Sequence, residues 1–133
     1  MSSINRPLAG PELTFDLRAI AAALRQEDTY DRSGRAARTL AKSGRMRMVL
    51  IAMAEGNVIH THQADSPMTL QVLEGDIQYR GEGGIHRLQE GEVLFFGPGD
   101  AHDITAARAT SMLLTISAIG DDFNPEHDHT GGF

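Results

Sequence analysis

Beyond the first third of the chain, hydrophobic positions recur in short runs that end at glycines, as is typical of β-strands joined by tight turns. In residues 110–119, Met112, Leu114 and Ile116 alternate with other residues and share one face. Residues 46–54 are apolar on both faces, which predicts a strand covered on both sides. Further strands are predicted over residues 68–74, 76–80, 85–88, 92–96 and 102–106. Many short strands with glycine-rich turns favour an antiparallel sandwich or barrel.

Residues 15–28 have a different period, which predicts a short amphipathic helix near the N-terminus. Leu17, Ile20, Ala21 and Leu24 recur at the spacing of one helical face, and Asp16 is placed to cap the first turn. The sequence therefore predicts three parts. They are an N-terminal helix and arm packing on the barrel over 1–34, the barrel over 35–119, and a C-terminal tail over 120–133.

The composition limits the classes of function. The chain has 133 residues, which fits one domain. It has no cysteine, which excludes a disulfide framework and thiolate metal sites and fits a cytoplasmic location. No stretch resembles a membrane span, so no membrane partner is expected. Twelve Lys and Arg against 18 Asp and Glu give a net charge of −6, and no nucleic-acid partner is expected.

Three histidines are the main candidates for chemistry. His60 and His62 stand two apart in a predicted strand, so both are expected to point inward with Thr61 outward. His102 follows a Gly-Pro-Gly turn and begins another strand. Three converging imidazoles would suit a divalent transition metal (Zn, Ni, Fe or Cu) with positions left open for water or substrate. The alternative is a pocket whose histidines hydrogen-bond a small ligand or one another.

The spacing of these residues resembles the two motifs of the cupin family. The first motif is matched by Gly56, His60, His62 and Gly75, and the second by Gly91, Gly99 and His102. The resemblance covers about residues 46–119. It implies an all-β fold, an antiparallel double-stranded jelly-roll (cupin) barrel, here with a short N-terminal helix. Such proteins are often homodimers with a metal or ligand pocket inside, so we expect a homodimer.

The chain departs from the family pattern at the metal-ligating glutamate. That glutamate would stand at Ser66, Pro67 or Met68, and none of these is acidic. A shell of three neutral histidines leaves a divalent ion with its full charge, so Mn loses its oxygen donor and Zn, Ni or Cu is favoured. The residues expected to line the pocket are Met68, Leu70 and Phe95.

Two functions follow from this pattern. The first is a small metal-binding cupin of unassigned activity, with a three-histidine pocket open to a small-molecule ligand or substrate. The second is a non-catalytic cupin that binds or senses a small ligand and has lost metal chemistry. No acid–base residue is evident, so the sequence does not decide whether the protein is an enzyme. His127 and His129 lie in the tail, where a solvated segment is commoner than a metal site.

Overall fold

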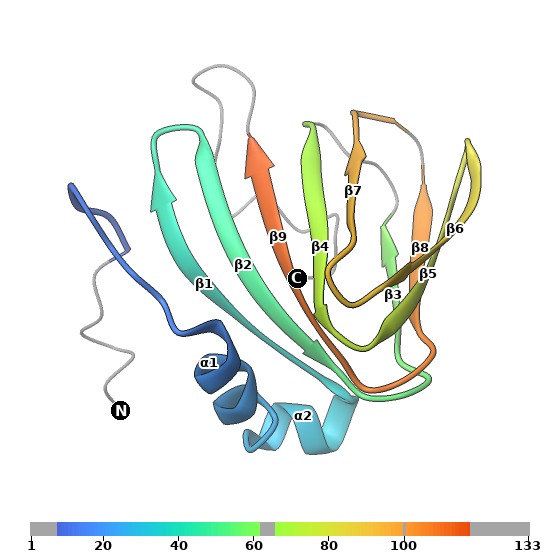
Figure 1. The fold of residues 1–133 in the computed structure, drawn as a ribbon, viewed down its shortest axis with the longest axis horizontal. Coiled ribbons are helices and arrows are strands. Elements are labelled where there is room, and N and C mark those ends of the chain that lie inside the picture. The colour runs from blue at the N-terminus through green and yellow to red at the C-terminus, as the bar shows by residue number, and fades with distance from the viewer. Residues whose placement is uncertain (1–7, 62–65, 100, 118–133) are drawn as a thin grey trace.

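Two antiparallel sheets pack against each other, and two short helices lie beside the larger sheet (Figure 1). The computed structural model describes residues 8–61, 66–99 and 101–117. In chain order the elements are α1 (Leu17–Leu24), α2 (Asp28–Ser33), β1 (Arg35–Ser43), β2 (Met46–Met53), β3 (Val58–Thr61), β4 (Met68–Glu74), β5 (Asp76–Gly81), β6 (Gly84–Gln89), β7 (Val93–Phe96), β8 (His102–Ala106) and β9 (Thr110–Ser117). The expectation of a mainly β, antiparallel fold is confirmed.

The chain crosses repeatedly between the two sheets. The five-stranded sheet has the order β1-β2-β9-β4-β7, and the four-stranded sheet has the order β3-β8-β5-β6. Among the described strands, only the β1–β2 and β5–β6 connections join two successive strands of the same sheet. The β5–β6 connection is a tight hairpin in which Gly81 pairs with Gly84. Segments far apart in the sequence therefore lie side by side throughout the molecule.

The core lies between the sheets because successive side chains of a strand point to opposite faces. From β4, Met68, Leu70 and Val72 enter this core, and from β9 it receives Met112 and Leu114. These five side chains are at most 5% exposed. The four-stranded sheet supplies the facing residues: Ile59, Ile77, Tyr79, Leu88, Ile104 and Ala106. The alternation seen in the sequence thus places one face of each strand in a common core.

The strand β2 is buried on both faces, as the sequence predicted. Val49 and Ile51 point into the core, whereas Leu50 and Ala52 belong to a second cluster on the outer face of the five-stranded sheet. Leu24 of α1 is fully buried in that second cluster. Helix α1 therefore covers the outer face at β1 and β2.

Helix α1 begins where a side chain satisfies its free backbone donors. Asp16 has an extended backbone, and its Oδ1 accepts a hydrogen bond from the backbone N–H of Ala19 at 3.1 Å. Near the other end, Arg25 lies 3.5 Å from Glu74 of β4. The cap sets the start of the helix, and the apolar stripe decides which face meets the sheet. Neither helix of the described chain has the length and hydropathy that crossing a bilayer requires.

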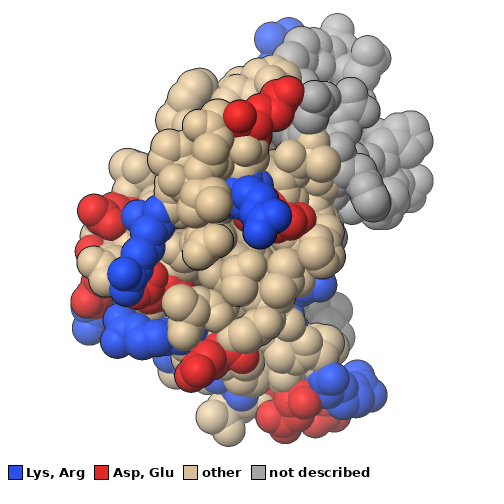
Figure 2. Space-filling view, turned by 90° about the vertical axis from the view of Figure 1, so that its right-hand side faces the viewer, with Lys and Arg blue, Asp and Glu red and all other residues tan. Residues whose placement is uncertain are grey.

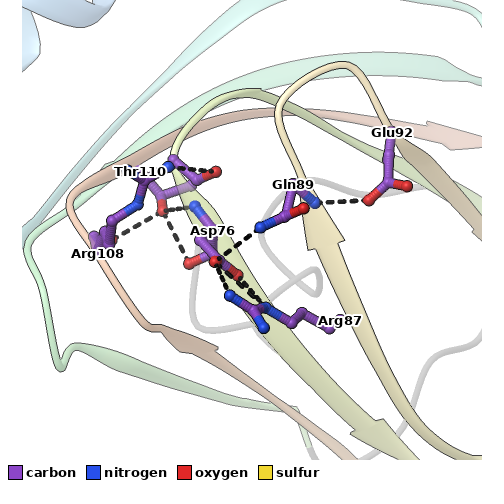
Figure 3. Close-up of polar contacts among 7 residues, drawn as sticks. Asp76, Arg87, Gln89, Glu92, Arg108 and Thr110 are labelled. Carbon is purple, nitrogen blue, oxygen red and sulfur yellow. Dashed lines mark hydrogen bonds and ion pairs between the residues drawn. The ribbon is translucent and has the colours of Figure 1, made fainter.

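A buried aspartate links the two sheets where β5 begins: its carboxylate bonds to β6, and its backbone bonds to β9 (Figure 3). Asp76 is 4% exposed, and its Oδ2 accepts a hydrogen bond from Nη2 of Arg87 at 2.7 Å. The side chain of Gln89 donates to the same oxygen at 3.4 Å. The backbone N–H of Asp76 donates to Oγ1 of Thr110, on β9 of the other sheet, at 3.1 Å. The bond from Arg87 holds the pKa of the Asp76 carboxyl below its ordinary value, although burial opposes this.

We expect Asp76→Asn to destabilise the protein at pH 7, because Arg87 loses its ionised partner. The lowered pKa means that ionised Asp76 stabilises the fold above the ordinary value of 3.8, and this contribution disappears as pH falls through the folded pKa. The difference in the free energy of unfolding between wild type and variant should therefore become smaller below pH 3.8. Urea unfolding across pH measures it. Glu90→Gln makes the same charge change at an exposed ion pair and should have little effect at any pH. A gap that stays constant with pH would contradict the prediction.

Candidate functional site

His60 lies on the outer face of the four-stranded sheet, so its expected inward orientation is wrong. Its side chain is 69% exposed, and its Nδ1 donates a hydrogen bond to Oδ1 of Asp103 at 2.8 Å. Thr61, expected to point outward, is 1% exposed. The reason is the register with β8, in which Ile59 pairs with Ile104 and both side chains are fully buried. Side chains on the same strand face as these isoleucines point into the core, whereas His60 lies on the opposite face and points outward.

His102 does point inward, opposite Thr61 in the β3–β8 register. It is 4% exposed, and burial lowers the pKa of its imidazole below the ordinary value of 6.5, with partial opposition from the nearby carboxylate of Asp103. The ring is therefore neutral at pH 7. A neutral imidazole carries one N–H donor and one free lone pair, so it can hydrogen-bond a ligand in either direction.

Two aromatic rings surround His102. Its ring stacks on Tyr79 of β5 with centroids 5.1 Å apart, and meets the ring of Phe96 edge-on at 5.0 Å. Tyr79 and Phe96 are themselves 5.3 Å apart. Burial raises the pKa of the Tyr79 phenol, with a smaller contribution from Glu82, so the phenol is neutral at pH 7. The three rings come from β5, β7 and β8, and thus from both sheets.

Two polar atoms on this inner face have no hydrogen-bond partner within the described structure. They are Nε2 of His102 and Oγ1 of Thr61, both buried. A buried polar atom without a partner destabilises a fold by about 1–3 kcal/mol. Such atoms in a folded protein therefore point to a bound molecule or a functional role.

A cavity of about 200 Å³ opens beside these rings. Its wall consists of Tyr79, Glu82, Gly83, Phe96, Gly97, Pro98, Gly99, Ala101 and His102. The wall combines aromatic faces, a buried imidazole and a glycine-rich loop. We call it the His102 pocket. A shallower hollow of about 270 Å³ adjoins it on the outer side and adds Arg80, Gly81 and Asp103 to the shared Glu82, Ala101 and His102.

The expected pocket-lining residues lie elsewhere. Met68 and Leu70 are core residues between the sheets and are absent from the wall of the His102 pocket. Phe95 is 67% exposed on the outer face of β7, so its assignment is wrong, and Phe96 takes that place. The register explains the exchange, because Phe96 pairs with Met68, whose side chain faces the core, whereas Phe95 pairs with outward-facing Thr69.

The described residues do not bring the predicted metal ligands together. His60 and His102 lie on opposite faces of one sheet, and His62, His127 and His129 lie outside the described residues. Within residues 8–61, 66–99 and 101–117, no three His, Cys, Asp or Glu side chains meet in a way that could hold a metal ion. The metal-ligand roles of His60, His62 and His102 stay predictions.

Sequence reasoning missed three residues of this site. Phe96 lies in a strand whose two faces are similarly apolar, and Glu82 lies in a tight turn where acidic residues are common. Tyr79 does carry a signal, since it stands two residues after Ile77 and therefore shares that residue's buried face.

No protein-family model matches this sequence, and no curated protein matches it. The structure, in contrast, resembles many solved ones. A conserved protein of unknown function from Streptococcus pyogenes is 18% identical with a TM-score of 0.65, over 86% of this chain and 94% of that one.

Two further neighbours carry a family description. An RmlC-like cupin from Shewanella frigidimarina is 22% identical with a TM-score of 0.61, over 69% of this chain and 83% of its own. A cupin superfamily protein from Desulfitobacterium hafniense is 16% identical with a TM-score of 0.66, over 84% and 96%. The sandwich of five and four antiparallel strands that holds the His102 pocket is therefore the cupin fold.

Proposed function

We propose that this chain is a ligand-binding cupin domain whose His102 pocket holds a small organic molecule. The observation that carries this proposal is the buried Nε2 of His102, which has no partner among the described residues and belongs to a side chain in the cavity wall. A ligand that hydrogen-bonds this nitrogen removes an energetic penalty that the protein otherwise bears. Binding is thereby coupled to the stability of the fold.

The pocket's size and walls limit the ligand. A volume of about 200 Å³ lies below the ~300–1,000 Å³ that drug-sized ligands occupy, so the ligand is small. Tyr79 and Phe96 offer apolar ring surface to its body, while His102 offers one directional hydrogen bond. The wall as a whole exposes more polar than apolar surface, so the ligand carries polar groups beside its apolar body.

The donor set does not favour the metal centre implied by the cupin resemblance. His102 is the only histidine in the wall of the His102 pocket as described, and its acidic neighbour there, Glu82, is exposed in a turn. We therefore propose that the pocket binds its ligand through the residues of its wall, without an assigned reaction.

A fragment screen tests the proposal. ¹⁵N-labelled protein is titrated with a library of one-ring organic fragments, and the imidazole nitrogen resonances are followed by NMR. We expect at least one fragment to shift the Nε2 signal of His102. His102→Ala should lose that binding, whereas His60→Ala, the same substitution on the outer face, should keep it. A library that leaves the His102 signals unchanged would refute the proposal, as would equal loss of binding in both variants.

A further inference from the structure

Glu82 is the acidic side chain in the wall of the His102 pocket as described, and no Lys or Arg of the described residues lines that wall. We propose that the ligand of this pocket is a small organic cation, with an amine beside Glu82 and an apolar body against Tyr79, Phe96 and His102. The inference rests on the ligand pocket proposed above and adds to it the charge class of the ligand.

Glu82 lies in an exposed turn at the edge of the pocket, opposite the segment 97–99. It lies in the two-residue connection between β5 and β6, whose ends are fixed by the pairing of Gly81 with Gly84. On the far side, a Cβ added to Gly99 would lie 3.4 Å from Oε1 of Glu82. The carboxylate therefore faces the loop that includes Gly97, Pro98 and Gly99 across the entrance. A ligand entering between these two segments passes close to the Glu82 carboxylate.

The aromatic walls favour the same sign of charge. The face of an aromatic ring is electronegative and attracts ammonium groups within about 6 Å. Tyr79 lies close enough to Glu82 for the carboxylate to contribute to its raised pKa, so the neutral phenol ring and the carboxylate act on the same space. A protonated amine near Glu82 is then attracted by the carboxylate and by the ring together.

An anionic ligand is the main alternative, and Arg80 is its candidate partner. Arg80 lines the adjoining outer hollow, not the His102 pocket, and it shares that hollow with Glu82 and Asp103. In that hollow, the two carboxylates therefore outnumber the single guanidinium. Figure 2 shows the face of the molecule that lies on the right of Figure 1: acidic and basic side chains form small separate groups on a largely uncharged surface. The charge preference of the pocket is thus local, set by Glu82.

An exposed carboxylate alone does not define a site, and His102 supplies the independent observation. Its side chain is 96% buried in the wall of the same cavity, and its Nε2 has no partner within the described part of the chain. In the tautomer that carries its proton on Nδ1, this nitrogen can accept a hydrogen bond from an N–H group of the ligand. A ligand that donates N–H bonds and carries positive charge therefore fits both the deep and the outer part of the pocket.

Calorimetric titration at low ionic strength with three probes of matched shape tests the charge class. Benzylamine is a cation, benzyl alcohol is neutral and benzoate is an anion. We expect benzylamine to bind on the order of tenfold more tightly than benzyl alcohol, with benzoate the weakest. Glu82→Gln should bring the affinity for benzylamine close to that for benzyl alcohol. Glu90→Gln, the same change in the turn at the other end of β6, should keep the preference.

The outcomes separate this inference from the proposed pocket. Equal affinities, a preference for benzoate, or a preference that survives Glu82→Gln would overturn the cationic ligand while the pocket stands. The same holds if fragments bind at His102 but benzylamine does not. If no fragment in the library binds at His102, both the proposed ligand pocket and the proposed charge of its ligand are refuted.

Discussion

Gly75→Ala is expected to destabilise the fold by about 3 kcal/mol, because steric overlap and backbone strain add at this position. Gly75 joins β4 to β5 and has a φ of +111°, in the region that only glycine adopts readily. A Cβ there would lie 2.6 Å from the carbonyl oxygen of Ala109 and from Cα of Thr110, and would overlap Oγ1 of Thr110. None of these atoms is the free end of a flexible side chain, so the backbone must move.

Gly56→Ala is the matched control for Gly75→Ala. Gly56 also has a positive φ, +86°, but a Cβ there meets no atom within 4 Å. Its substitution should bring only the backbone strain of about 1–2 kcal/mol. Chemical denaturation of both variants gives the two free energies of unfolding. Equal losses would show that the close approach of Gly75 to Thr110 contributes nothing.

His102→Phe is expected to make the protein more stable and to abolish ligand binding. Phenylalanine keeps the ring contacts with Tyr79 and Phe96 and removes the unpartnered Nε2, a gain of about 1–2 kcal/mol. The cavity beside the ring gives room for the larger side chain. Stability and binding then change in opposite directions, which is the behaviour of a residue kept for function.

The gain from His102→Phe should grow at acid pH. Because the folded pKa of His102 lies below 6.5, the unfolded chain takes up the proton first, and wild-type stability falls as pH drops from 6.5 to the folded pKa. The His102→Phe variant has no imidazole at this position, so it does not lose this part of its stability as the pH falls. Urea unfolding at pH 8 and pH 5.5 measures both effects, with exposed His86→Phe as the control. A variant that is less stable than wild type at both pH values would contradict the prediction.

The sequence predicted best where one face of a strand is clearly more apolar than the other. In β9, Met112, Leu114 and Ile116 mark the buried face, and in β2 the apolar residues on both faces correctly indicated two coverings. Strand β1 was not delimited, since its alternation of arginine with alanine and leucine is not a strong apolar pattern. The six-residue helix α2 was missed because it has no buried side chain.

The errors at the site have a single physical origin. In residues 58–61, Val58 and Ile59 are equally apolar and point to opposite faces, so a shift of one residue exchanges His60 for Thr61. The same ambiguity holds in β7, where Leu94 and Phe96 face the core while Val93 and Phe95 face outward. Pairing with β8 and β4 decides both cases. A local pattern cannot contain that information, because it comes from partners about 25 to 45 residues away.

The position of β9 also governs when the molecule can assemble during synthesis. Of the described strands, β9 is the last in the chain, yet it lies in the middle of the five-stranded sheet, between β2 and β4 (Figure 1). Until the ribosome releases residues 110–117, β2 and β4 have no common partner, and apolar side chains such as Ile51 and Leu70 lack their neighbours on that sheet. The five-stranded sheet therefore cannot close before β9 has been synthesised, and nascent chains truncated before residue 110 should be protease-sensitive and dependent on chaperones.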